Sequence, residues 1–198
     1  AFWGEDGGIT LSGGEILLQP EFALEVFKQC KEHGISTCLD TCGAPFTRRE
    51  PWFSLFNELL EYTDILLVDI KHINSDEHKR LTGYPNENIL DLCEYLSELG
   101  KPVWIRHVLV PGITDDDKYL KELGKYIKTL KNVEKVEVLP YHTMGVRKYK
   151  EMGIKYRLEG VEPPTADRIE NAEKLLCVAD YKGYLTWKPG INTKEQGL

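Results

Sequence analysis

Apolar residues cluster in five short runs along this 198-residue chain, and polar motifs follow four of these runs. Several runs, such as residues 65–68, are apolar at consecutive positions, which is typical of strands buried on both faces of a parallel sheet. We expect five strands, at residues 9–12, 35–40, 65–69, 103–110 and 133–139.

Helical patterns separate these runs. Proline at a helix start, glycine just past its end, and an N-cap followed by acidic residues mark their limits. We expect helices from Pro20 to Gly34, from Pro51 to Tyr62, through Ile89 and Leu99, after an N-cap at Thr114, and after Pro163-Pro164-Thr165. Strands that alternate with helices predict right-handed βαβ units. Five strands cannot close an eight-stranded barrel, so the pattern favours an α/β fold with a partial barrel, with a doubly wound sheet as the alternative.

Residues 1–180 are long enough for one domain with a sizeable core. Within this domain, residues 141–163 have no clear period and carry five basic side chains, on a chain that is acidic as a whole. A connection of this length is usually functional or disordered. For residues 181–198 we expect a tail with a loose strand around Trp187 and a mobile end.

The net charge of −7 argues against a nucleic-acid partner, which rewards clustered cations. No apolar run approaches the roughly 20 residues that cross a bilayer, and the first residues lack the features of a signal peptide, so no membrane partner is expected. Five irregularly spaced cysteines indicate a reducing cytoplasm rather than a disulfide framework. Because a strand begins as early as Ile9, we expect an excised piece of a longer protein.

Polar motifs follow four of the strands, and a parallel sheet gathers such motifs at one edge. After the first strand, Gly13 and Gly14 allow a ligand to approach the backbone, and the carboxylate of Glu15 can accept bonds from an ammonium group. A tight turn with a surface acid is the alternative interpretation.

Asp69 and Lys71 lie two residues apart at the end of the third strand, so they point to the same side. The lysine can hold a carboxylate or phosphate there, and the aspartate can orient it. Asp40 and Thr41 form a similar polar pair at the end of the second strand. A local salt bridge at the rim is the alternative in both places.

Arg106 and His107 interrupt the fourth apolar run, and strand alternation sends them to opposite faces. We expect Arg106 to face the barrel interior, where a buried cation needs an anion, and His107 to lie beneath a helix. The periodicity also allows the reverse assignment. His142 follows the fifth strand and is a candidate ligand or proton partner, or a plain surface histidine.

Cys38 and Cys42 have a spacing that suggests an iron–sulfur site. A third ligand would be needed near Pro45, which cannot ligate, and Cys38 lies inside a strand. We therefore interpret both cysteines as structural.

In combination, these motifs resemble the radical S-adenosylmethionine (AdoMet) superfamily and, within it, the pyruvate formate-lyase activating enzymes. The resemblance covers roughly residues 9–178 and rests on the stretches Ser12-Gly13-Gly14-Glu15, Asp40-Thr41-Cys42-Gly43, Asp69-Ile70-Lys71, residues 103–112, Leu139-Pro140-Tyr141-His142 and residues 160–164. It implies a partial (β/α)6 barrel of the TIM type that binds AdoMet across its strand ends.

The resemblance also implies roles for single residues. Gly13, Gly14 and Glu15 match the motif that receives the methionyl amino group. Lys71 matches a residue near the methionyl carboxylate, and His142 matches one near the nucleoside.

Four further residues match positions of the same AdoMet pocket. Asp40, Thr41 and Asp69 correspond to positions that can also hold a monovalent cation. Arg106 corresponds to a strand residue near the opening, where it would help to seat the substrate loop.

The implied reaction requires a reduced [4Fe–4S] cluster, which cleaves AdoMet to a 5′-deoxyadenosyl radical. The radical then takes a hydrogen atom from a glycine of pyruvate formate-lyase. An electron donor such as flavodoxin or ferredoxin is implied as a second partner.

The chain departs from the family's pattern, because the cluster-binding loop Cys-x-x-x-Cys-x-x-Cys and the first β/α unit are not in this sequence. We therefore expect this piece alone to be inactive and to bind AdoMet weakly. An activase of another glycyl radical enzyme, with or without a ferredoxin-like insert upstream, and a cluster-free barrel that only docks to a partner are the alternatives.

Overall fold

The computed structural model describes residues 7–188. Its centre is one parallel sheet with the strand order β1-β2-β3-β4-β5. The strands are β1 (Gly8–Leu11), β2 (Ser36–Thr41), β3 (Ile65–Asp69), β4 (Val103–Leu109) and β5 (Val133–Pro140). The five predicted strands and their parallel pairing are confirmed.

Helices connect the strands, and the five predicted ones are present as α1 (Pro20–Glu32), α2 (Trp52–Glu61), α4 (Glu87–Leu99), α5 (Asp117–Ile127) and α7 (Ala166–Leu175). Two helices were not predicted, α3 (Ser75–Thr82) and α6 (Val146–Glu151). Short 3-10 turns complete the described chain at Ile16–Leu18, Thr143–Gly145, Val178–Asp180 and Gly183–Leu185.

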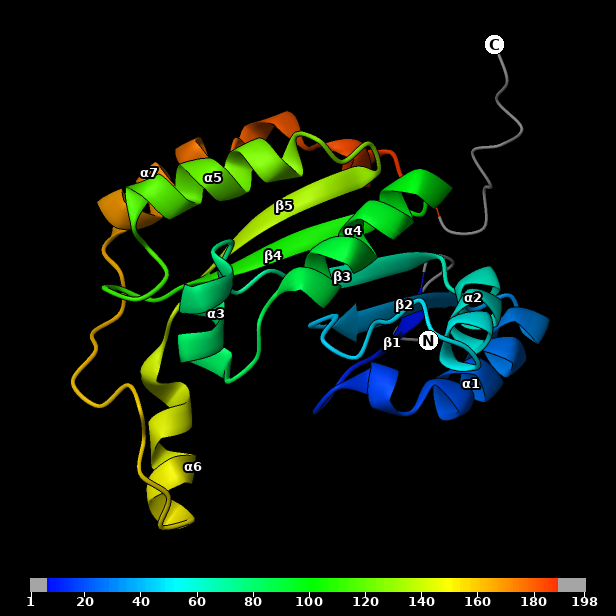
Figure 1. Ribbon diagram of the computed structural model, residues 1–198, viewed down its shortest axis with the longest axis horizontal. Helices are drawn as coiled ribbons and strands as arrows, with labels where there is room; N and C mark the ends of the chain where they lie inside the picture. Colours follow the sequence, from blue (N-terminus) through cyan, green and yellow to red (C-terminus); the bar gives the residue numbers. More distant parts are fainter. Residues whose placement is uncertain (1–6, 189–198) are drawn as a thin grey trace.

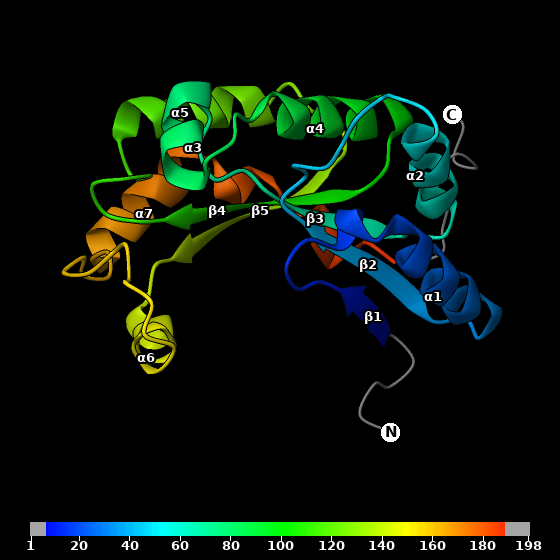
Figure 2. The same ribbon diagram turned by 60° about the horizontal axis from the view of Figure 1, so that its bottom comes forward.

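The sheet has one face covered by helices and an opposite face that carries both charged and apolar side chains. On β4, Ile105 and His107 are buried on the helix side, whereas Trp104 and Arg106 alternate with them on the other side. Figure 2 shows α3, α4 and α5 together on one side of the sheet, while α6 projects away from them (Figure 1). The architecture is therefore an α/β partial barrel, with the strand ends open at one rim.

The parallel register arranges side chains in rows across the face opposite the helices. Asp69 pairs with Arg106, and Arg106 pairs with Glu137 on the next strand. Alternate side chains of neighbouring strands therefore meet as layers, as in barrels of this type. This register brings charged groups that are far apart in sequence to one place.

The loop after β4 differs from its prediction, because Asp116 and not Thr114 is the N-cap of α5. The side chain of Asp116 accepts a bond from the backbone nitrogen of Lys118 at 2.7 Å. Thr114 is buried instead, and its hydroxyl donates to the Val108 carbonyl at 2.6 Å and accepts from the Val110 nitrogen at 2.8 Å. The threonine thus closes the turn before the helix rather than starting the helix.

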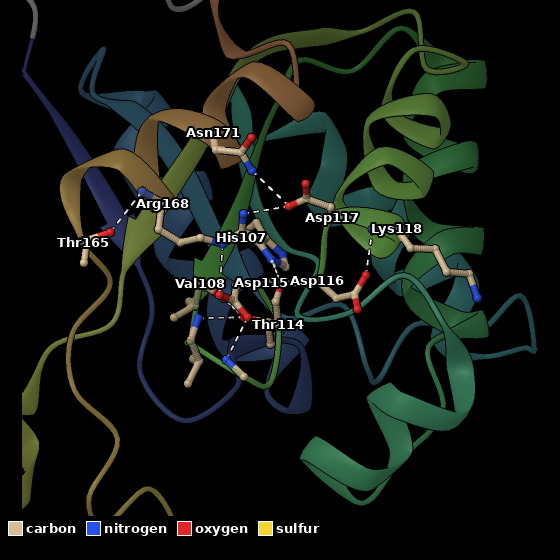
Figure 3. A network of polar contacts seen from close by, with 12 residues as sticks. His107, Val108, Thr114, Asp115, Asp116, Asp117, Lys118, Thr165, Arg168 and Asn171 are labelled. Atoms are coloured by element: carbon tan, nitrogen blue, oxygen red, sulfur yellow. Dashed lines mark hydrogen bonds and ion pairs between the residues drawn. The ribbon is translucent and has the colours of Figure 1, made fainter.

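Arg168 of α7 joins this loop to the last helix. Its guanidinium donates to Asp115 at 3.1 Å and to Asp117 at 2.7 Å, as Figure 3 shows. Asn171, one turn further along α7, also donates to Asp117 at 3.0 Å. These contacts hold the loop between β4 and α5, and the first turn of α5, against α7.

Residues 181–188 contain the 3-10 turn Gly183–Leu185 and no strand, unlike the prediction. The ring of Tyr184 meets Trp104 edge to face, with centroids 6.2 Å apart, and the ammonium of Lys135 lies 4.8 Å from the Trp104 ring. These aromatic and cation–π contacts replace strand pairing. The mobile end expected for the tail falls on 189–198, outside the described residues.

None of the helices within residues 7–188 has the length and apolar character needed to cross a bilayer.

Candidate functional site

The turn after β1 is built from two glycines with left-handed backbone. Gly13 has φ +92° and Gly14 has φ +43°, a region that side chains with a Cβ seldom adopt. No other atom lies within 4 Å of where a Cβ would stand at either position. The backbone of this turn is therefore open to a ligand at the end of the strand.

Glu15 follows the glycines and turns its carboxylate inward. Its Oε1 accepts from the Leu17 nitrogen at 2.9 Å and from the Thr41 hydroxyl at 2.5 Å, and its Oε2 accepts from the Cys42 nitrogen at 2.8 Å. A carboxylate offers about four acceptor positions, so one remains for a further donor. The three hydrogen bonds fix the carboxylate of Glu15, including its fourth acceptor position, beside the end of β2.

A chain of alternating charges crosses the ends of the next strands. The guanidinium of Arg106 donates to Asp40 and, at 2.9 Å, to Asp69. The ammonium of Lys71 in turn lies 3.2 Å from the second oxygen of Asp69. The arginine and both carboxylates are mostly buried, with side-chain exposures between 15% and 25%. Lys71 is more exposed and keeps donors for a ligand.

Arg106 faces this charge chain, and His107 faces the helices, which confirms the expected assignment. Burial alone would lower the pKa of Arg106, but the carboxylates of Asp69 and Asp40 outweigh burial and raise it. His107 is 3% exposed, and its ring nitrogens lie 2.8 Å from the Ile70 carbonyl and 3.0 Å from the Thr114 carbonyl. Burial lowers the pKa of this histidine.

His142 lies apart from the charge chain, exposed at the end of β5. It lines a groove of about 900 Å³ whose floor is formed by the ends of β4 and β5 and whose wall is the segment around α6. Among the contacts of residues 7–188, none joins His142 directly to Glu15 or Lys71. The structure thus links Glu15, Asp40, Thr41, Asp69, Lys71 and Arg106 through contacts and places His142 at the far end of the same rim.

The cysteines near the rim have protonated thiols. Burial raises the pKa of Cys38 and of Cys42 to about 11 in each case. Within residues 7–188, no group of three or more His, Cys, Asp or Glu side chains is placed to hold a metal ion.

Two features of the site were not predicted from the sequence. The backbone nitrogen of Cys42 holds Glu15, and no sequence signal marks it because every residue except proline carries this donor. The groove wall depends on the hydroxyls of Tyr141 and Tyr156, which lie 2.9 Å apart. Both tyrosines lie within the aperiodic segment 141–163, and no sequence pattern predicts their contact.

The charges of the rim are complementary to those of a small zwitterion. One acceptor position of Glu15 suits an ammonium group, and Lys71, on the third strand, suits a carboxylate. Asp40 and Asp69 fix Arg106 between them, so the surrounding charges hold each other in place.

Comparison with known proteins identifies the class and then the family. A family model described as the radical SAM superfamily matches residues 1–124. The pyruvate formate-lyase-activating enzyme of Streptococcus mutans is 54% identical over 183 residues, which are 92% of this chain and 70% of that protein. The enzyme of the same name from Listeria monocytogenes is 48% identical over 182 residues, which are 91% of this chain and 73% of that protein.

A solved structure agrees with these relatives. A domain of pyruvate-formate lyase-activating enzyme from Bacteroides vulgatus superposes with a TM-score of 0.70 at 28% identity and covers 88% of this chain and 94% of that domain. The chain belongs to the radical SAM superfamily and, within it, to the family of pyruvate formate-lyase-activating enzymes.

Proposed function

We propose that this chain supplies the AdoMet-binding portion of an enzyme that activates pyruvate formate-lyase. The observation that carries the proposal is the placement of Glu15 and Lys71 at one rim of a partial barrel, in a chain of this family. Glu15, with Gly13 and Gly14, takes the methionyl ammonium group, and Lys71 takes the methionyl carboxylate. His142 contacts the nucleoside from the groove side of the rim.

The residues fit AdoMet on two observations. The positions beside Gly13 and Gly14 are open, so the backbone of that turn can approach a ligand. Glu15 retains an acceptor position after its three bonds to the protein. Thr41 completes the pocket by holding Glu15, and Arg106, itself bound by Asp40, holds Asp69. We further propose that a monovalent cation binds at Asp40, Thr41 and Asp69.

The described residues do not fit a [4Fe–4S] cluster, because no third ligand joins Cys38 and Cys42 in a group that could hold a metal ion. We propose that the cluster ligands lie upstream of this chain and that the chain alone is inactive. When bound, the reduced cluster and AdoMet together supply the 5′-deoxyadenosyl radical that removes hydrogen from a glycine of the partner. This chain's part is to bind and orient AdoMet and to exclude water from the reacting atoms.

The partner in this proposal is pyruvate formate-lyase, in keeping with the names of the relatives. Flavodoxin or ferredoxin is the proposed electron donor, and the cytoplasm is the proposed compartment. The alternative is an activase of another glycyl radical enzyme, because Glu15 and Lys71 would bind AdoMet in either case and do not select the partner.

The test is anaerobic reconstitution of the full-length protein with iron and sulfide, followed by incubation with AdoMet, a reductant and purified pyruvate formate-lyase. We expect the electron paramagnetic resonance signal of a glycyl radical on pyruvate formate-lyase. A glycyl radical that forms only on a different glycyl radical enzyme would identify that enzyme, and not pyruvate formate-lyase, as the partner. Failure to take up iron would favour a cluster-free docking protein.

A further inference from the structure

Lys71 lies on a stretch of chain without regular structure. Strand β3 ends at Asp69 and α3 begins at Ser75, so residues 70–74 between them are neither strand nor helix. A lysine side chain is long and has many rotamers, so the position of its ammonium group depends on how firmly the backbone beneath it is held. The groups that hold this backbone therefore decide how well Lys71 is placed for a ligand.

Asn86 binds the backbone directly after Lys71. Its side-chain nitrogen donates to the carbonyl of His72 at 2.9 Å and to the carbonyl of Ile73 at 2.8 Å. The amide group of an asparagine has two N–H donors, and these two bonds use both of them. Asn86 is 1% exposed, so both bonds are shielded from water.

Strand β4 binds the backbone directly before Lys71. The backbone nitrogen of Ile70 donates to the Arg106 carbonyl at 3.0 Å, and Nδ1 of His107 lies 2.8 Å from the Ile70 carbonyl. The backbone on both sides of Lys71 is thus tied to other elements, before it by β4 and after it by Asn86. The support from Asn86 depends on one side chain, so a substitution can remove it without altering the sheet.

Asn86 is itself held firmly, because it is the N-cap of α4. Its carbonyl accepts from the backbone nitrogens of Ile89 and Leu90, each at 3.0 Å, and Ile89 is 1% exposed in the core. The loop after β2 packs on the same turn, since a Cβ at Gly43 would lie 3.5 Å from the backbone of Ile89 and 3.0 Å from the Leu92 side chain. The start of α4 therefore supports the loops after both β2 and β3.

We propose that Asn86 is a positioning residue for AdoMet binding, which holds the backbone after Lys71 so that the ammonium group is directed at the methionyl carboxylate. This inference deepens the proposed function and rests on it for the identity of the ligand. A backbone that is fixed in advance has less freedom to lose on binding, so the contribution of Lys71 to affinity depends on Asn86. A residue that only started α4 would affect stability without acting through Lys71.

The first test measures the AdoMet affinity of the reconstituted full-length protein by titration calorimetry. We expect Asn86→Ala to raise the Kd about fivefold to tenfold, because two hydrogen bonds that hold the loop are lost. The matched control is Asn132→Ala, which removes another buried asparagine whose amide donates to a backbone carbonyl, that of Lys101 at 2.5 Å. Asn132 precedes β5 at the opposite ends of the strands, so this variant should lose stability but keep its Kd within about twofold. A Kd of Asn86→Ala within twofold of the wild type, or equal increases in both variants, would overturn the proposal.

A double-mutant cycle separates positioning from general stability. In the Lys71→Ala background, Asn86→Ala should raise the Kd by no more than about a further twofold, because the side chain that Asn86 positions is already gone. An undiminished increase in that background would show that Asn86 acts independently of Lys71 and would contradict the inference. Asn86→Ser keeps a residue type favoured at helix starts but lacks the second donor. It replaces Asn86→Ala in the same cycle if that variant does not fold, with an expected rise in Kd of about threefold to fivefold.

Hydrogen exchange distinguishes a failure of this inference from a failure of the proposed function. Without any ligand, the backbone amides of residues 71–74 should exchange about tenfold faster in Asn86→Ala than in the wild type or in Asn132→Ala, because the loop opens more often. Faster exchange together with no AdoMet binding by the wild type would leave the support of the loop by Asn86 standing and refute the proposed function. Unchanged exchange would show that Asn86 does not hold this loop and would overturn the inference.

Discussion

The backbone nitrogen of Cys42 donates to Oε2 of Glu15 at 2.8 Å, and this bond ties the turn after β1 to the tip of β2. The two residues lie 27 positions apart in sequence. Parallel strands end at the same edge, so an acid placed just after one strand can accept a bond from the end of its neighbour. The first and second strand ends are thereby held as one binding edge.

We predict that Glu15→Gln destabilises the protein by about 1–3 kcal/mol. Both carboxylate oxygens of Glu15 accept from backbone N–H groups, and in glutamine an amide nitrogen replaces one of these acceptors. The check is urea denaturation. Glu32→Gln, at the exposed end of α1, is the control and should change the free energy of unfolding by less than about 0.5 kcal/mol. A Glu15→Gln variant as stable as the control would mean that the carboxylate does not hold this edge together.

Asp69 should contribute more to stability than Asp40, because Asp69 bridges two cations and Asp40 contacts one. We expect Asp69→Asn to cost about 2–3 kcal/mol and Asp40→Asn about 1–2 kcal/mol, since each leaves a mostly buried arginine with fewer partners. The two variants serve as controls for each other in the same unfolding assay. If Asp40→Asn lowers the free energy of unfolding more than Asp69→Asn, the ion pairs assigned to these two carboxylates are wrong.

His107 should make stability depend on pH. Because burial lowers its pKa in the folded state below the ordinary value of 6.5, the unfolded chain binds the proton more readily. The contribution of His107 is fully present above about pH 6.5 and declines as pH falls below that value, with a slope of at most about 1.4 kcal/mol per pH unit. Between pH 5 and 7.5, the free energy of unfolding should depend less steeply on pH for His107→Gln than for the wild type. Identical slopes would refute the effect.

Gly124 allows α5 and α7 to approach each other. A Cβ at this position would lie 2.4 Å from the backbone oxygen of Leu175, so Gly124→Ala must push the helices apart. We expect a loss of about 1–3 kcal/mol, although alanine is the better helix former. Gly145→Ala is the matched control, because φ is −73° there and no atom lies within 4 Å of the new Cβ. The helix contact is unimportant if both variants behave alike in thermal unfolding.

The apolar runs predicted the strands well because burial on both faces leaves a strong signal, as in Ile65 to Val68. They did not predict α3, whose only buried residue is His78, or α6, which buries none. A helix without an apolar face gives no period to detect. The cap of α5 was placed two residues early at Thr114, because three acids follow it and each can act as an N-cap.

Part of the candidate site could also be predicted from the positions of polar residues along and after the strands. Strand ends and alternation place Asp69 and Lys71 on one side and send Arg106 and His107 to opposite faces, but alternation alone does not decide which of these two faces the interior. The sequence did not indicate that Arg106 contacts Asp40 as well as Asp69, because that depends on the stagger between three strands. The strand expected near Trp187 is a 3-10 turn, since Tyr184 packs on Trp104 rather than pairing along β5.

The central claim is that the rim formed by the ends of β1 to β3 binds AdoMet. The most direct measurement is the AdoMet affinity of the reconstituted full-length protein by titration calorimetry, for the wild type, Lys71→Ala and the exposed control Lys125→Ala. We predict that Lys71→Ala weakens binding about tenfold or more, equivalent to about 1.4 kcal/mol, with the control within twofold. An unchanged Kd for Lys71→Ala would contradict the claim.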